Sequence, residues 1–155
     1  MSHRRALAPA LAALFALAIC PAGAAADGLV LPGLGEDRLD EAELRSGATV
    51  VVVWASWSPR CRDIGRRVNE LAAGWKGRAR VITVNFQEEK AAAREFRDSQ
   101  QLASPVFLDA DAAFAKKHGV TSLPFLLVFR DGDSLFAGKL PPDAGATLSR
   151  VLGSG

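Results

Sequence analysis

The chain has 155 residues, of which 19 are basic and 17 acidic, and 49% of them are hydrophobic. That length suffices for one domain with a self-supporting core. The near balance of charge excludes the strongly basic surface that nucleic-acid binding requires, so we expect no nucleic-acid partner.

The first residues predict an exported protein. Arg4 and Arg5 precede an apolar stretch at 7–19, and a run of three alanines ends at Ala26. The stretch is too short to cross a bilayer core of about 30 Å, and this layout is typical of a secretory signal peptide. We therefore predict cleavage after Ala26, a mature domain at 27–155 without a membrane span, and a periplasmic or secreted location.

Two alternatives concern the same segment. A buried N-terminal helix is disfavoured by Pro9 and Pro21, and lipid attachment at Cys20 is disfavoured by the bulky Ile19 before it. The route of export, general secretory or twin-arginine, stays open. Once Cys20 leaves with the leader, Cys61 is the single remaining cysteine, and one thiol cannot close a disulfide within the chain.

Beyond the leader, the hydrophobic pattern alternates between strands and helices. A continuous β-branched run at 48–54 predicts a central strand that is buried on both faces. Ser58 and Pro59 are preferred residues at a helix start, and apolar residues then follow at helical spacing until Gly74. The other expected elements are an extended piece at 29–31, a helical turn at 40–44, a strand at 80–86, a helix at 88–101, a strand at 105–108, a helix at 109–118, strands at 125–129 and 135–137 around an Asp131-Gly132 turn, and a helix at 142–152. This order predicts an α/β fold with a central mixed β-sheet flanked by helices.

Two motifs resemble those of thioredoxins. The residues at 54–61, Trp-Ala-Ser-Trp-Ser-Pro-Arg-Cys, resemble the active-site sequence Trp-Ala-x-Trp-Cys-x-x-Cys. The residues at 119–125, Gly-Val-Thr-Ser-Leu-Pro-Phe, resemble the loop that carries the family's cis-proline, which is Pro124 here. Residues 84–89 and 105–109 look like the insert of the TlpA/ResA (redoxin) branch of bacterial extracytoplasmic proteins. The resemblance implies a thioredoxin-like fold and a part in cell redox homeostasis.

Three departures from the family pattern bear on activity. Ser58 stands where the family has its attacking cysteine, so the motif is a degenerate Ser-x-x-Cys. Arg66 lies near the place of a helix proline, and no acid occurs at 50–53, where many thioredoxins keep a buried carboxylate. The first departure excludes the usual dithiol–disulfide cycle within the chain.

Ser58 is expected to act as a helix N-cap. A helix N-terminus contributes about 0.3–2 kcal/mol, which activates a thiol but not a hydroxyl. A nucleophilic serine would also need a general base. His118, the single histidine of the mature chain, is expected instead to be a cation at a helix C-terminus.

Cys61 lies on the apolar stripe of the helix with Ile64 and Val68, which favours a buried and inert thiol. The alternative is a catalytic role, in which Cys61 forms a mixed disulfide with a partner thiol protein or with glutathione. The resemblance places the family's shielded, resolving cysteine at this position.

The loop formed by Thr121, Ser122, Leu123 and Pro124 has two interpretations, and both stay open. A cis bond there would serve the tight turn into the next strand. In the resembled family the same loop also pairs with an extended substrate peptide through backbone hydrogen bonds. Trp57 beside the loop would add an apolar contact.

Four arginines, at positions 60, 62, 66 and 67, crowd the first turns of the predicted helix, where cations are disfavoured. An anionic partner would explain this cluster. A solvated face with an Arg66–Glu70 pair at i, i+4 explains it with fewer assumptions.

These interpretations predict an exported binding module that is redox-inactive or weakly redox-active. It would recognise extended or thiol-containing polypeptides in the extracytoplasmic thiol/disulfide system. The alternative is a monothiol oxidoreductase that uses Cys61 with an external thiol, in disulfide exchange or cytochrome c maturation. We expect neither a metal site nor a cofactor.

Overall fold

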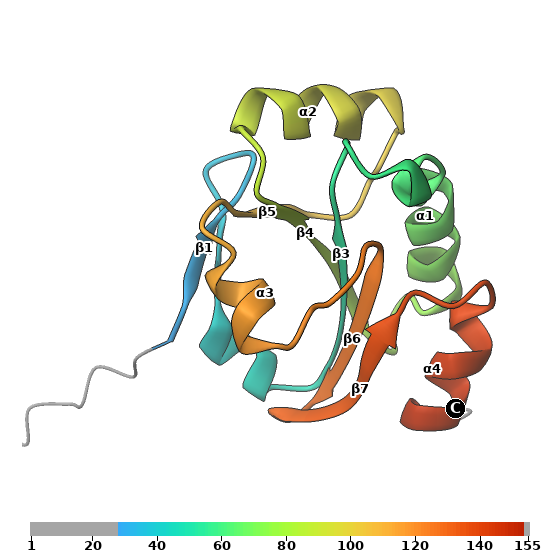
Figure 1. Ribbon diagram of the computed structural model, residues 1–155. Coiled ribbons are helices and arrows are strands. Elements are labelled where there is room, and N and C mark those ends of the chain that lie inside the picture. Colours follow the sequence, from blue (N-terminus) through green and yellow to red (C-terminus); the bar gives the residue numbers. More distant parts are fainter. Residues whose placement is uncertain (1–27, 154–155) are drawn as a thin grey trace, which may run out of the picture.

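The computed structural model describes residues 28–153, so the predicted signal peptide and its cleavage site lie outside the described residues. The elements are β1 (Val30–Pro32), β2 (Arg38–Asp40), η1 (Glu41–Arg45), β3 (Ala48–Trp54), η2 (Pro59–Cys61), α1 (Ile64–Gly74), β4 (Arg80–Phe86), α2 (Lys90–Ser99), β5 (Val106–Asp109), α3 (Ala113–Lys117), β6 (Phe125–Arg130), β7 (Asp133–Lys139) and α4 (Ala144–Leu152). They confirm the predicted α/β fold with a mixed sheet between helices (Figure 1).

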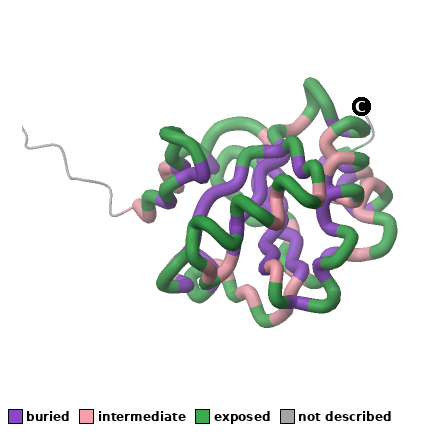
Figure 2. Tube along the Cα trace, turned by 90° about the horizontal axis from the view of Figure 1, so that it is seen from above, coloured by how far each residue is buried: buried purple, intermediate pink, exposed green. Residues whose placement is uncertain are grey.

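Strand β3 lies at the centre of the five-stranded sheet, whose order is β5-β4-β3-β6-β7. It pairs parallel with β4 and antiparallel with β6. Its valines alternate between two separate cores, Val50 and Val52 in one and Val51 and Val53 in the other, and all four are fully buried. Figure 2 shows the buried segments gathered in the middle of the domain, with exposed segments around them. The β-branched run at 48–54 is therefore buried on both faces, as its composition predicts.

Helices cover both faces of the sheet. On one face, the core contains side chains of α1, α2 and α4, among them Ile64, Ala93 and Leu148. On the other face, Leu44 of η1 and Phe114 of α3 pack against the strands. Helix α2 crosses above the end of the sheet at which β3 and β4 finish (Figure 1). Within residues 28–153, no helix has the length and apolar character needed to cross a membrane.

The two edges of the sheet differ. The chain entering the domain covers the β5 edge, because the Leu34 N–H donates to the Val106 carbonyl at 3.1 Å and Gly33 forms a bridge with Phe107. At the other edge, β7 is paired with β6, and within the described residues no further strand follows it.

The four predicted α-helices all begin later than expected, α2 and α4 by two residues each and the other two by more. The helix expected from Ser58 is divided into η2 and α1, because Asp63, with φ −113° and ψ 20°, interrupts the helical backbone between them. The helix expected at 109–118 begins at Ala113, because Ala112 lies in the left-handed region at φ 61° and a helix cannot continue through that conformation. The carboxylate of buried Asp109 instead accepts the N–H groups of Phe114 and Ala115, at 3.0 and 2.9 Å.

Candidate functional site

The turn after β3 buries Ser58 and hydrogen-bonds its backbone on both sides. The Ser58 N–H donates to the Ala55 carbonyl at 3.2 Å, and the Cys61 N–H donates to the Ser58 carbonyl at 2.9 Å. Ser58 is the N-cap of η2 by position, but its side chain makes no capping hydrogen bond. The hydroxyl instead lies close enough to the Cys61 thiol to lower the pKa of that thiol, and the residue is only 7% exposed. The N-cap prediction is thus right for the backbone and wrong for the side chain.

The Cys61 thiol is fully buried. Burial raises its pKa above the ordinary value, and this effect outweighs the hydrogen bonds from the Ala55 backbone and the Ser58 hydroxyl and the attraction of Arg67, all of which lower it. Because the thiolate is the reactive form, a buried thiol with a raised pKa is a poor nucleophile at neutral pH.

Glu88 joins this turn to the end of β4, and sequence analysis missed its role. Its carboxylate accepts the Ser56 N–H at 2.8 Å, the Ser56 hydroxyl, and the Asn85 side-chain amide at 2.5 Å. Its negative charge contributes to the raised pKa of Cys61. A carboxylate from the loop after β4 thus lies beside the turn, although β3 itself carries no acid. Glu88 was expected inside the first turn of a helix, but α2 begins only at Lys90, which leaves Glu88 free to reach Ser56.

Trp57 is the exposed residue of the turn. Its side chain is 60% exposed, and its ring centroid lies 6.3 Å from that of Phe86, at the end of β4. Exposed large apolar side chains are rare in the described residues, where Val30 and Leu135 are the other two. An aromatic ring held open to solvent on a rigid turn is suited to bind an apolar group.

The loop at 121–124 lies at the same end of the sheet. Val53 is opposite Phe125 and Trp54 is opposite Asn85, so the turn after β3 and the loop before β6 meet there. The Leu123–Pro124 peptide bond is cis. The loop is held at both ends, by a bond from the Val120 N–H to the Ala115 carbonyl and one from the Leu140 N–H to the Pro124 carbonyl.

Between these two anchors, the backbone of Thr121, Ser122 and Leu123 is open. Their N–H and C=O groups make no hydrogen bond with any residue in 28–153. The Ser122 hydroxyl oxygen is buried and likewise has no partner in that part of the chain. Because unpaired backbone groups are strong donors and acceptors, this segment offers an edge with which an extended peptide can pair.

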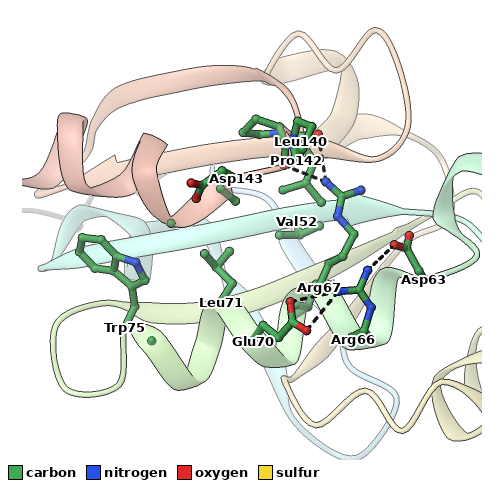
Figure 3. A pocket seen from close by; sticks show the side chains of 15 residues that line it. Val52, Asp63, Arg66, Arg67, Glu70, Leu71, Trp75, Leu140, Pro142 and Asp143 are labelled. Carbon is green, nitrogen blue, oxygen red and sulfur yellow. Dashed lines mark hydrogen bonds and ion pairs between the residues drawn. The ribbon is translucent and has the colours of Figure 1, made fainter.

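Two of the four clustered arginines, Arg66 and Arg67, are engaged by neighbouring groups. Arg66 pairs with Asp63 at 2.9 Å and with Glu70 at 3.1 Å, which confirms the predicted i, i+4 pair (Figure 3). The sequence suggested that Arg67 lies on a solvated face, but in the structure it is half-buried. Its guanidinium donates to the Leu140 and Pro141 carbonyls, at 3.2 and 2.8 Å, beside a cavity of about 610 Å³ between α1 and the start of α4 (Figure 3).

His118 lies at the C-terminal end of α3, as predicted, but its burial disfavours the cationic form expected there, and its Nε2 faces Glu41, not Ser58. It packs between Phe114 and Phe129, and burial lowers its pKa, although the Glu41 carboxylate opposes this effect. Its Nε2 lies 2.8 Å from Oε1 of Glu41, which also pairs with Lys117. This cluster ties α3 to η1. Within residues 28–153, no group of three His, Cys, Asp or Glu side chains is placed to hold a metal ion.

Comparisons with known proteins agree with the fold described above. The family model described as Redoxin matches residues 21–149. Over 89 residues the chain is 35% identical to the thiol:disulfide interchange protein DsbE of Yersinia pestis, which is 55% of this chain but only 45% of that protein. It is 27% identical over 92 residues to thioredoxin of Staphylococcus aureus, covering 59% of this chain and 67% of that one. The fold is also similar to that of a secreted Mycobacterium tuberculosis disulfide oxidoreductase homologous to DsbE, with a TM-score of 0.68, 20% identity, and coverage of 81% of this chain and 96% of the other.

Proposed function

The chain belongs to the Redoxin family, and on this basis we propose that it is an extracytoplasmic, thioredoxin-like module that binds extended polypeptides without dithiol turnover. Its relatives include proteins named for thiol:disulfide exchange, and one structural neighbour is described as secreted. The predicted leader supports the same location.

The turn at Ser58 supports the absence of dithiol turnover. Disulfide exchange begins with attack by a thiolate, and position 58 carries a hydroxyl. Within the described residues, Cys61 is the one cysteine, and it is buried with a raised pKa. The turn therefore lacks both the attacking thiol and an accessible second one.

The loop at 121–124 supports polypeptide binding. Adding an extended peptide to an open backbone edge satisfies N–H and C=O groups on both chains. Trp57 would bind an apolar side chain of the same peptide, since its exposed ring lies at the same end of the sheet. The observation that carries the proposal is the unpaired backbone of residues 121–123 near the exposed Trp57, together with the inaccessible Cys61 thiol.

The test combines a defined ligand with a capture experiment. The defined ligand is the S-alkylated B chain of insulin, which is extended and has no free thiol. We expect it to bind the wild type and the Cys61→Ala variant alike, with or without reductant. Trp57→Ala should weaken binding by about 1–3 kcal/mol. Val30→Ala removes another exposed apolar side chain, from β1, and serves as the matched control.

The alternative, a monothiol oxidoreductase, predicts a different pattern. Partners captured from a periplasmic extract would then depend on Cys61, would be released by reductant, and would survive Trp57→Ala. Failure of the alkylated peptide to bind, together with such Cys61-dependent partners, would overturn the binding module in favour of the enzyme.

A further inference from the structure

Two arginines of the turn after β3, Arg60 and Arg62, have no ion-pair partner in residues 28–153. Both are exposed, whereas Arg66 and Arg67 of the same cluster are engaged by groups of the chain. The helix dipole disfavours cations close to the start of a helix, so α1 gains no stability from positive charge at these two positions. The charges of Arg60 and Arg62 are therefore available to a ligand.

The turn places both arginines on its outer side, together with Trp57. Residues three apart share a face of a 3₁₀ helix, and Ser58 and Cys61 are both buried, so that face of η2 points inward. Trp57, Arg60 and Arg62 are all exposed. The α-carbons of Trp57 and Arg60 lie at most about 11 Å apart, because only two residues stand between them. Since an arginine side chain is long and flexible, a ligand that contacts the Trp57 ring is within reach of the Arg60 guanidinium.

The acids near this surface do not compensate the two arginines. The Asp63 carboxylate pairs with Arg66 at 2.9 Å (Figure 3), and Glu88 is half-buried and accepts hydrogen bonds from the turn and from β4. Glu89 is exposed, but Lys90 follows it directly and is exposed as well. The loop at 121–124, on the other side of the proposed peptide site, carries no charged residue. The surface around Trp57 is therefore positively charged, and a ligand with negative charge complements it.

We propose that the peptide site selects acidic polypeptides: Arg60 and Arg62 bind an aspartate or glutamate of the ligand while a neighbouring apolar side chain of the ligand contacts Trp57. The inference rests on the proposed function, since the ligand backbone would pair with the loop at 121–124. Side chains two positions apart in an extended peptide lie on the same face, about 7 Å from each other. An acid two positions from the apolar residue thus matches the spacing between Trp57 and the arginines. Guanidinium groups bind carboxylates through two parallel N–H donors, which suits them to this role.

Isothermal titration calorimetry of the purified protein with three matched peptides tests the proposal. Each peptide has about nine residues, blocked ends and a central phenylalanine, with glutamate, glutamine or lysine two positions to either side of it. At about 50 mM salt, the wild type should bind the glutamate peptide about fivefold to tenfold tighter than the glutamine peptide, and the lysine peptide most weakly. At about 500 mM salt this preference should fall below about twofold, because exposed charges are then screened. The combined Arg60→Gln and Arg62→Gln substitutions should bind the glutamate and glutamine peptides with similar affinities.

Arg38→Gln with Arg150→Gln is the matched control, because it removes the same charge at exposed positions on β2 and in the last turn of α4. This control should keep the preference for the glutamate peptide. A wild type that binds all three peptides alike would overturn the selection of acidic ligands and leave the binding module standing, as would a preference that survives the loss of both Arg60 and Arg62. A wild type that binds none of the peptides would overturn both. If the double variant fails to fold, the salt dependence of the wild type decides the question.

Discussion

The turn at 58–61 and the loop at 121–124 lie at the same end of the sheet and are built in opposite ways. In the turn, the polar groups are used internally: the Ser58 hydroxyl faces the Cys61 thiol, and the thiol is buried. In the loop, three consecutive residues leave their backbone groups unpaired among the described residues. The features that redox chemistry requires and those that we propose bind a peptide therefore lie in separate segments, so a chain could lose the first set and keep the second.

The two regions are also held by different forces. Close packing and uncharged hydrogen bonds hold the helix behind the turn, where Gly65 of α1 lies against the backbone of Gln100 and Asn69 exchanges hydrogen bonds with Gln101 and Ala103. Polar contacts hold the helix before the loop, where Asp109 caps α3 and Glu41 binds its last turn. Changes to the turn should therefore act through sterics and accessibility, and changes near the loop through charge.

The strongest test of the closed turn is the reactivity of Cys61. Its alkylation by a thiol reagent should be at least about a thousandfold slower in the native protein than after unfolding, because the reagent must wait for an opening of the core. Mass spectrometry of the peptide that contains Cys61 measures the rate. If Cys61 in the native protein were alkylated about as fast as a free thiol, the turn would be as accessible as the loop, and the monothiol enzyme would be favoured.

Ser58→Cys should restore to the turn the chemistry that it lacks. The new thiol would start η2 next to Cys61, and we expect a disulfide between them on oxidation. Reduction of insulin with dithiothreitol should rise to about a hundredfold above the rate without protein, whereas the wild type stays at that background. Ser58→Ala is the control and should fold without activity. A folded Ser58→Cys variant that forms no disulfide would show that the turn resembles an active site only in sequence.

Gly65→Ala should test the packing behind the turn. A β-carbon at this position would lie 2.3 Å from the Gln100 carbonyl oxygen, so α1 or the backbone at Gln100 must shift. We expect the free energy of unfolding in urea to fall by about 1–3 kcal/mol. Gly74→Ala on the same helix meets no atom within 4 Å and should be neutral or slightly stabilising. Equal effects at the two glycines would contradict the close approach.

The smallest expected effect concerns pH and the charges that hold α3. Burial lowers the pKa of His118 from its ordinary 6.5, so the unfolded state binds the proton more readily, and this contribution to stability is lost as pH falls below about 6.5. The pKa of Glu41 is also lowered: burial raises it, but bonds from Lys117, the Leu29 N–H and His118 outweigh burial. Its contribution is lost at lower pH, below 4.5.

Urea unfolding at pH 7.5 and pH 5.5 isolates the histidine. The wild type should be less stable at the lower pH, and His118→Gln should reduce that difference, since glutamine does not titrate. A His118→Gln variant with the same pH dependence as the wild type would show that another group is responsible.

Much of the fold follows from local patterns in the sequence. The β-branched run at 48–54 and the Asp131-Gly132 turn each predict an element that the structure contains. Helix starts are less predictable, because they depend on single backbone conformations. Ala112 in the left-handed region and Asp63 outside the helix are set by tertiary contacts, and neither residue type signals them.

The site shows the same division. Spacing alone brought Ser58 and Cys61 into one turn, and the apolar stripe predicted that Cys61 is buried, as it is. The hydrogen bonds between Glu88 and Ser56 join residues far apart in the chain. Acidic residues are common near helix starts, so Glu88 could not be recognised from the sequence as a partner of Ser56. The hydrogen bonds of Arg67 to two backbone carbonyls could not be predicted for a similar reason. Every residue has a backbone carbonyl, so the sequence does not indicate which of them accepts a bond from an arginine.

The burial of the aromatic residues has a consequence for spectroscopy. The chain contains three tryptophans and no tyrosine, and Trp54 and Trp75 are buried whereas Trp57 is exposed. A quencher dissolved in water should therefore act mainly on the fluorescence of Trp57, and the emission of the two buried indoles should remain as a constant background. A peptide that covers Trp57 would shield it from the quencher and shift its emission to shorter wavelength. The protein thus contains its own optical reporter at the surface where we expect a ligand, and no added label is needed to follow binding.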